Sequence, residues 1–96
     1  MSNIENWNSE EEMLRDLRDR GFSPHRYTYP PGTSFPPHAH ATDKMATVLS
    51  GRFRITMGGN SVVLEKGDGV FVPRGVVHSA EVVGSEPVVS VDAPRV

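Results

Sequence analysis

The sequence predicts a small all-β domain, a sandwich or barrel, preceded by one short helix. Three observations support this fold class. Turn residues recur roughly every eight to twelve positions after residue 21, the segments between them alternate apolar and polar side chains, and no helical period appears among them. Because 96 residues suit one domain, we expect an N-terminal segment and helix over residues 1–21 and a single barrel domain over residues 22–96.

Composition narrows the classes of function. The net charge of −2 at pH 7 gives no basic field for nucleic acid or an anionic membrane. The first residues are charged rather than apolar, and no stretch approaches the ~20 apolar residues that a membrane span needs. We therefore expect a cytoplasmic protein without a nucleic-acid or membrane partner. Since the chain has no cysteine, its small core needs other support, such as subunit association or a bound metal.

The helix is expected near residues 9 to 20. Ser9 followed by Glu12 is a capping box, in which two side chains satisfy backbone N–H groups that have no helical partner. Acidic residues follow the start of the helix and arginines precede its end, an arrangement that complements the helix dipole. Gly21 then ends the helix. A narrow apolar stripe could dock on a sheet or on a second subunit, and it consists of Met13, Leu14 and Leu17.

Short extended segments follow the helix. Pro30-Pro31-Gly32 ends the first of them, and Gly58-Gly59-Asn60 is a tight hairpin signal. We expect strands over residues 22–29, 45–50, 52–57, 61–65, 70–73, 78–83 and 87–93. His25 lies in the first strand without any companion motif residue, so we expect an exposed or partly packed side chain there rather than a ligand.

Two short segments hold three of the four histidines. On an extended chain, His38 and His40 point to the same face because strand side chains alternate. A third imidazole from a later strand, His78, would complete a set of neutral nitrogen donors of the kind that holds a first-row divalent metal. An isolated His-x-His pair is otherwise most simply two solvated loop histidines.

The spacing of these residues carries a resemblance. Gly32-x5-His38-x-His40-x3-Lys44-x6-Gly51, followed by Gly67-x5-Pro73-x-Gly75-x2-His78, resembles the two sequence blocks that define the cupin superfamily. The resemblance implies a small single-domain cupin, of the cupin_2-like and RmlC-like kind, with a jelly-roll (double-stranded β-helix) barrel. Two positions depart from the family pattern: Lys44 stands where the family has a metal-binding glutamate, and Val82 stands where it has an asparagine.

The resemblance also implies a site. His38, His40 and His78 match metal-ligand positions, and the expected cofactor is a divalent transition metal, Zn, Ni, Fe, Cu or Mn. Lys44 has no lone pair to give when protonated, so we treat it as a candidate catalytic residue that takes a proton or holds an anionic ligand. Asp43 is a candidate fourth ligand, although alternation points it away if Lys44 faces inward.

Two classes of function fit this site. The first is a metal-dependent dioxygenase, an oxidoreductase, or a related small-molecule enzyme that uses three histidines, as some cupins that act on thiols or β-dicarbonyls do. The alternative is a non-catalytic barrel that binds or senses a small molecule. Tyr27 and Tyr29 are further acid–base candidates whose facing is open. The residues expected to shape the pocket are Ala46, Val48, Phe71 and Val82.

Assembly is expected to cover a second apolar surface. Alternating strands with apolar residues on both faces need a cover on each side. We therefore expect a homodimer formed through an outer sheet face that bears Met45, Leu49 and Phe53.

Overall fold

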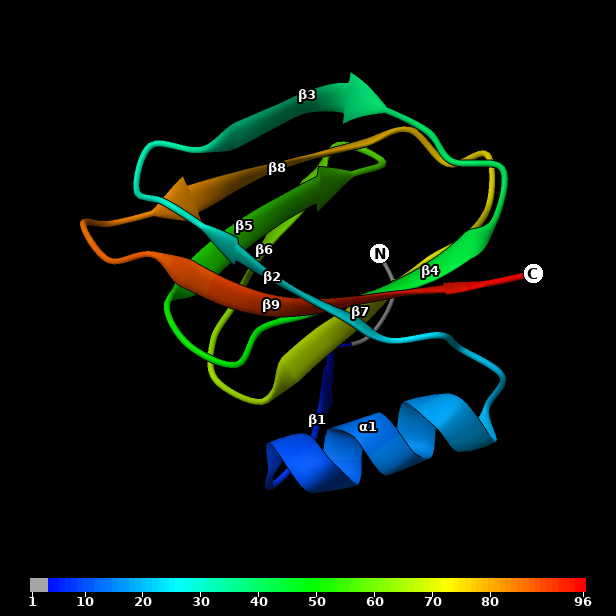
Figure 1. The fold of residues 1–96 in the computed structure, drawn as a ribbon. Coiled ribbons are helices and arrows are strands. Elements are labelled where there is room, and N and C mark those ends of the chain that lie inside the picture. The colour runs from blue at the N-terminus through cyan, green and yellow to red at the C-terminus, as the bar shows by residue number, and fades with distance from the viewer. Residues whose placement is uncertain (1–3) are drawn as a thin grey trace.

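Two antiparallel sheets form a jelly-roll barrel, and one helix packs on its outside (Figure 1). This computed structural model describes residues 4–96. The five-stranded sheet has the order β1-β7-β4-β9-β2 and the four-stranded sheet the order β3-β8-β5-β6. The elements are β1 (Ile4–Asn6), α1 (Glu10–Asp19), β2 (His25–Tyr29), β3 (Ser34–His38), β4 (Asp43–Thr47), β5 (Arg52–Met57), β6 (Asn60–Leu64), β7 (Asp68–Val72), β8 (His78–Val83) and β9 (Val88–Arg95). The predicted fold class, an all-β jelly roll with one short helix, is confirmed.

The ends of α1 follow the signals in the sequence. The Ser9 hydroxyl accepts a hydrogen bond from the Glu12 backbone N–H at 3.1 Å, which caps the start. At the other end, Gly21 adopts a φ of 86° and donates to the Arg18 carbonyl, while the Phe22 N–H donates to the Leu17 carbonyl at 2.9 Å. This pair of bonds is a Schellman motif. Phe22 therefore belongs to the end of the helix, and β2 begins three residues later, at His25.

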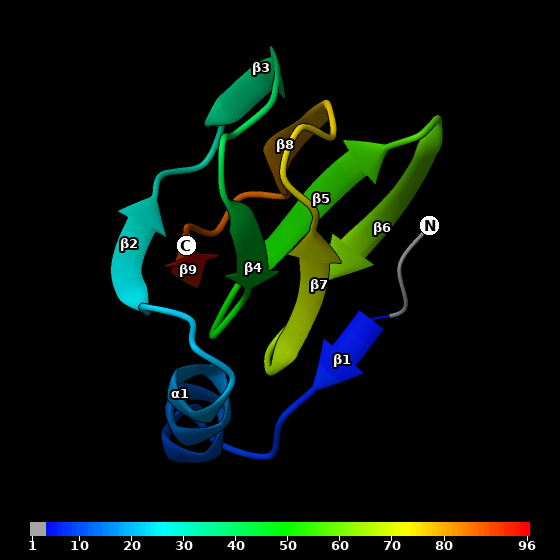
Figure 2. The same cartoon turned by 90° about the vertical axis from the view of Figure 1, so that its right-hand side faces the viewer.

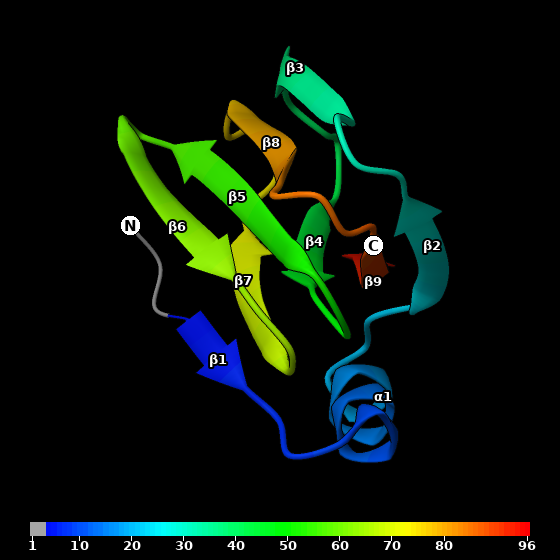
Figure 3. The same cartoon turned by 90° about the vertical axis from the view of Figure 1, so that its left-hand side faces the viewer.

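Helix α1 covers the outer face of the five-stranded sheet, so this sheet lies between the helix and the four-stranded sheet (Figures 2 and 3). Met13 and Leu17 are both 0% exposed at this contact. The apolar residues that α1 and the sheet bury together are Trp7, Met13, Leu17, Phe22, Met45, Val91 and Ala93. Burial of this stripe fixes the helix on the barrel and leaves its charged face to solvent.

A second core fills the space between the sheets. Its buried members are Val48, Phe53, Ile55, Met57, Leu64, Val70, Val72, Val82 and Val88. The face predicted for dimer contact is therefore wrong: Met45 lies under α1, Leu49 packs against the same cluster, and Phe53 points into the barrel with 5% exposure. The helix already supplies the cover that was expected from a second subunit. The homodimer itself stays a prediction.

Two strands, β3 and β1, were not among the expected strands, and β1 lies at the edge of the five-stranded sheet. Its three residues pair with β7, with Ile4 opposite Val70, and the chain then places Trp7 against Gly69. A Cβ atom on Gly69 would lie 2.7 Å from Cζ3 of Trp7, so only glycine permits this contact. The part of the chain from residue 4 onward contains no helix that is long and apolar enough to cross a membrane.

Candidate metal centre

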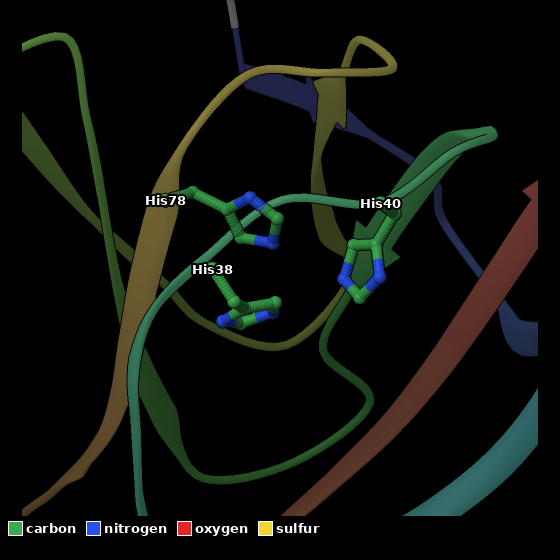
Figure 4. A group of neighbouring side chains, drawn as sticks. All are labelled: His38, His40 and His78. Carbon is green, nitrogen blue, oxygen red and sulfur yellow. The ribbon is translucent and has the colours of Figure 1, made fainter.

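Three imidazoles meet at one end of the barrel, between the two sheets (Figure 4). His38 is the last residue of β3 and His78 the first of β8, and the two are directly paired across the sheet. His40 lies two residues beyond the end of β3, so the loop to β4 determines its position. The sequence had instead suggested that strand alternation places it on the same face as His38. The ring centroids are 4.3 Å apart for His38 and His78, 4.7 Å for His38 and His40, and 5.1 Å for His40 and His78.

Two of these rings have a fixed orientation. The Nδ1 atom of His38 lies 2.7 Å from the Pro36 carbonyl oxygen, and the Nδ1 atom of His78 lies 3.0 Å from the Val76 carbonyl oxygen. A carbonyl oxygen only accepts, so each Nδ1 carries the proton and donates it. The Nε2 atom of each ring is then the one with a free lone pair. Metal-ligating histidines are commonly oriented in this way by a hydrogen bond from the other nitrogen.

The donor set fits a divalent transition metal. One ligand atom from each of His38, His40 and His78 lies within 4.8 Å of the other two. Imidazole nitrogens bind first-row ions at about 2.0–2.1 Å, which places two ligands of one ion roughly 3 Å apart, so small side-chain rotations suffice. Three neutral nitrogens suit zinc, iron, nickel or copper and leave open coordination positions.

A turn in the second sequence block connects the two histidine segments. Gly75 has a φ of 76° at the third position of a turn in which the Val76 N–H donates to the Pro73 carbonyl at 3.3 Å, as in a type II turn. The Gly75 N–H then donates to the His40 carbonyl at 2.9 Å. The proline and glycine of this block thus hold the backbone of His40 next to the segment that leads into His78.

Asp43 supports the same loop and points away from the histidines. Its carboxylate accepts a hydrogen bond from the Arg74 backbone N–H at 2.9 Å and lies 3.5 Å from the guanidinium of Arg95. The Arg74 N–H, followed by the charges of both arginines, holds the pKa of Asp43 below its usual value. Asp43 is not among the residues that come together at the histidine site, which agrees with the alternation argument.

A cavity with a volume of about 170 Å³ extends from the histidines into the barrel. Of the four residues expected to shape it, only Ala46 lines it; Val48 and Val82 lie in the core, and Phe71 faces α1 because Val70 and Val72 take the inward positions of β7. The lining residues are Tyr29, Phe35, His38, His40, Lys44, Ala46, Phe53, Ile55, Val72, His78, Ala80, Ser90 and Asp92.

Lys44 lines the cavity and forms an ion pair there with Asp92. Its Nζ atom lies 2.8 Å from Oδ2 of Asp92, and the two side chains are 22% and 23% exposed. Asp92 was not predicted from the sequence as a residue of the site. The available signal was the pair of polar residues at alternate positions, Ser90 and Asp92, in the otherwise apolar run of residues 87–94, because such residues share one face.

The cavity changes the acid–base properties of two of its residues. Burial lowers the pKa of His40 below its usual value, and the nearby charge of Lys44 lowers it further. Burial raises the pKa of Tyr29 to about 12, with a second contribution from Asp92, so Tyr29 is a neutral phenol. Tyr27 stacks on Tyr29 at a centroid distance of 6.2 Å but does not line the cavity. His25 is exposed in β2 and also lies outside it.

Known proteins resemble this chain in sequence and in fold. It is 38% identical over 65 residues to "Uncharacterized protein SCO3923" from Streptomyces coelicolor, an alignment that covers 68% of this chain and 62% of the relative. A predicted oxalate decarboxylase from Thermotoga maritima has a similar structure, with a TM-score of 0.70, 23% identity and coverage of 97% and 78%. An RmlC-like cupin from Shewanella frigidimarina gives a TM-score of 0.68, 26% identity and coverage of 77% and 65%. The Cupin_2 family model, which describes a cupin domain, matches residues 25–94, and the chain therefore belongs to this family.

Proposed function

We propose that the protein is a metal-dependent cupin that acts on a small molecule bound in the barrel cavity, with oxidation of the dioxygenase type as the first reaction to test. The observation that carries the proposal is the convergence of His38, His40 and His78 at the cavity, two of them with Nδ1 anchored and Nε2 free. Solvated loop histidines would have no reason to share this orientation.

Each part of the cavity has a role in this proposal. The three histidines would hold a divalent ion, which supplies Lewis-acid or redox chemistry and open positions for a substrate oxygen. Lys44 offers N–H donors to an anionic group of the substrate, and Tyr29 stays neutral and can donate a hydrogen bond. The aromatic wall of Phe35 and Phe53 excludes water and strengthens these polar contacts.

Metal content tests the proposal directly. Purified protein should contain about one transition ion per chain by elemental analysis, and removal of the ion by a chelator should lower the melting temperature. A ligand at 100 times its Kd stabilises the folded state by about 2.7 kcal/mol, which corresponds to roughly 10–20 °C for a domain of this size. His78→Ala should abolish both effects, whereas His25→Ala, at a histidine outside the cavity, should retain them.

Two results would separate the parts of the proposal. Equal melting curves before and after chelation, with no ion in the elemental analysis, would contradict the metal centre. Oxygen uptake with a panel of diketones, thiols and phenols tests catalysis. A metal-loaded protein that binds members of this panel and converts none would instead be a small-molecule-binding barrel.

A further inference from the structure

The ion pair of Lys44 and Asp92 lies in the wall of the cavity. The two residues come from neighbouring strands, with Lys44 on β4 opposite Pro94 and Asp92 on β9 opposite Ala46. Within residues 4–96, no side chain other than the partner donates to or accepts from either charged group. The two charged groups therefore line the same cavity as the histidines and form no side-chain hydrogen bond except the one between them.

Both charged groups keep hydrogen-bonding capacity for a ligand. An ammonium has three N–H donors, and a carboxylate accepts about four hydrogen bonds. The observed contact uses one donor of Lys44 and one oxygen of Asp92. The side chains are 22% and 23% exposed, and both line the cavity, so the unused donors and acceptors are accessible from it.

The pair sets a condition on the ligand. A simple carboxylate that approaches Lys44 also approaches the negative charge of Asp92, and this repulsion opposes binding. A ligand that carries a hydroxyl or ammonium group next to its carboxylate can satisfy Lys44 with the carboxylate and Asp92 with the donor. We infer, on the basis of the proposed function, that the cavity recognises small 2-hydroxy or 2-amino acids through the Lys44–Asp92 pair.

The position and size of the cavity restrict this class further. Lys44 and Asp92 line the same cavity as His38, His40 and His78, so an acid held by the pair shares this small cavity with the histidines. The cavity of about 170 Å³ is close to the ~150 Å³ that accommodates benzene in a protein core. Apart from Tyr29 and Ser90, the remaining wall is apolar. The ligand is thus an acid of roughly six to eight non-hydrogen atoms with a short apolar side chain.

Calorimetric titration with three acids of equal carbon skeleton tests the inference: propanoate, 2-hydroxypropanoate and 2-aminopropanoate. Both the zinc-loaded and the metal-free protein are titrated, because a hydroxyl or amine can also bind the ion. We expect the substituted acids to bind at least about 10-fold more tightly than propanoate in both forms, as a hydrogen bond to a charged group contributes at least this factor.

Two variants assign the preference to the pair. In Asp92→Asn, propanoate should bind at least as tightly as in the unmodified protein because the repulsion is gone, and the preference for the substituted acids should fall to about threefold or less. In Lys44→Met, all three acids should weaken by about 10-fold or more. Asp19→Asn removes the same charge from the exposed face of α1 and should change nothing. Circular dichroism of each variant confirms folding.

The possible failures are distinguishable. If the protein takes up zinc but binds the three acids equally, the inference is wrong and the proposed metal centre stands. If the preference persists unchanged in Asp92→Asn, the pair has no such role, and loss of the preference in the metal-free form would then assign it to the ion. If neither zinc nor another divalent transition ion is taken up, the proposed function fails, and titration of the metal-free protein still decides whether the pair discriminates among the acids.

Discussion

Replacement of Lys44 by methionine leaves the carboxylate of Asp92 in an apolar cavity wall without its partner. The contact is 2.8 Å long, and a Coulomb energy at this distance ranges from about 1.5 kcal/mol in water to about 6 kcal/mol at an effective dielectric constant of 20. Because about a fifth of each side chain is exposed, screening and desolvation reduce the net value towards the lower figure. We expect Lys44→Met to lower the free energy of unfolding of the metal-free protein by about 1–2 kcal/mol.

Replacement of the other member of the pair, Asp92, should lower the free energy of unfolding by less. In Asp92→Leu, the flexible stem of Lys44 can carry its ammonium to solvent, whereas the short Asp92 side chain cannot escape in Lys44→Met. The double variant replaces the pair with two apolar residues, which is often neutral or stabilising. It should therefore recover most of the loss, and the double-mutant cycle should give a coupling energy of about 1–2 kcal/mol.

Urea unfolding at pH 7 with a chelator present measures this cycle. The matched control is the pair of Arg15 and Glu11 on α1, which has a similar distance of 3.0 Å but side chains that are 68% and 83% exposed, respectively. This surface pair should couple by only about 0.3–0.5 kcal/mol. A coupling between Lys44 and Asp92 no larger than that of the surface pair would refute the reasoning from burial.

Three further results are expected. Leu17→Ala should lower the free energy of unfolding by about 2–4 kcal/mol, because this 0% exposed side chain fills the contact between α1 and the sheet. A loss below about 1 kcal/mol in urea unfolding would show that the packing of α1 contributes little to stability. Gly69→Ala should cost about 1–3 kcal/mol and shift the fluorescence of Trp7, whose ring the new methyl group would meet at 2.7 Å; unchanged emission and stability would contradict this packing. Trp7 also donates to Asp16 at 3.0 Å, and this bond lowers the pKa of Asp16 from its usual 3.8. The resulting stabilisation is present above about pH 4 and is lost as the pH falls through the lowered pKa of Asp16. The fluorescence emission of Trp7 should therefore change with pH with a midpoint below 3.8. In Asp16→Asn, this change should be absent.

Local signals in the sequence predicted the helix and the turns well. Ser9, Glu12 and Gly21 act within one turn of their own positions, so their patterns carry the boundaries of α1 almost completely. Strand β1 could not be predicted in this way. Its three residues are held by pairing with β7, more than sixty positions away in the chain, and no local preference reports such a contact.

The facing of side chains was predictable only in part. Alternation correctly indicates that neighbouring strand residues face opposite ways, but it does not say which face lies inside the barrel. Met45 was expected on a dimer face and Phe71 in the pocket, and both expectations depended on which face lies inside. The docking of α1 and the pairing of β7 determine that face. In the site, the histidines were predicted from their spacing, while Asp92 was missed because it meets Lys44 across 48 positions of the chain.

Strand β3 has consequences for the mechanical integrity of the barrel. It is an edge strand, bonded only to β8, and its register shifts between Phe35 and His38. An ion shared by His38 and His78 would act as a removable crosslink between these strands in a chain that has no cysteine. Unlike a disulfide, the ion would be held only by the folded chain, so it would stabilise this edge through its binding free energy and not by restricting the unfolded chain. Loss of the ion should therefore loosen this edge of the barrel first, with faster hydrogen exchange in β3 than in β5 at the centre of the sheet.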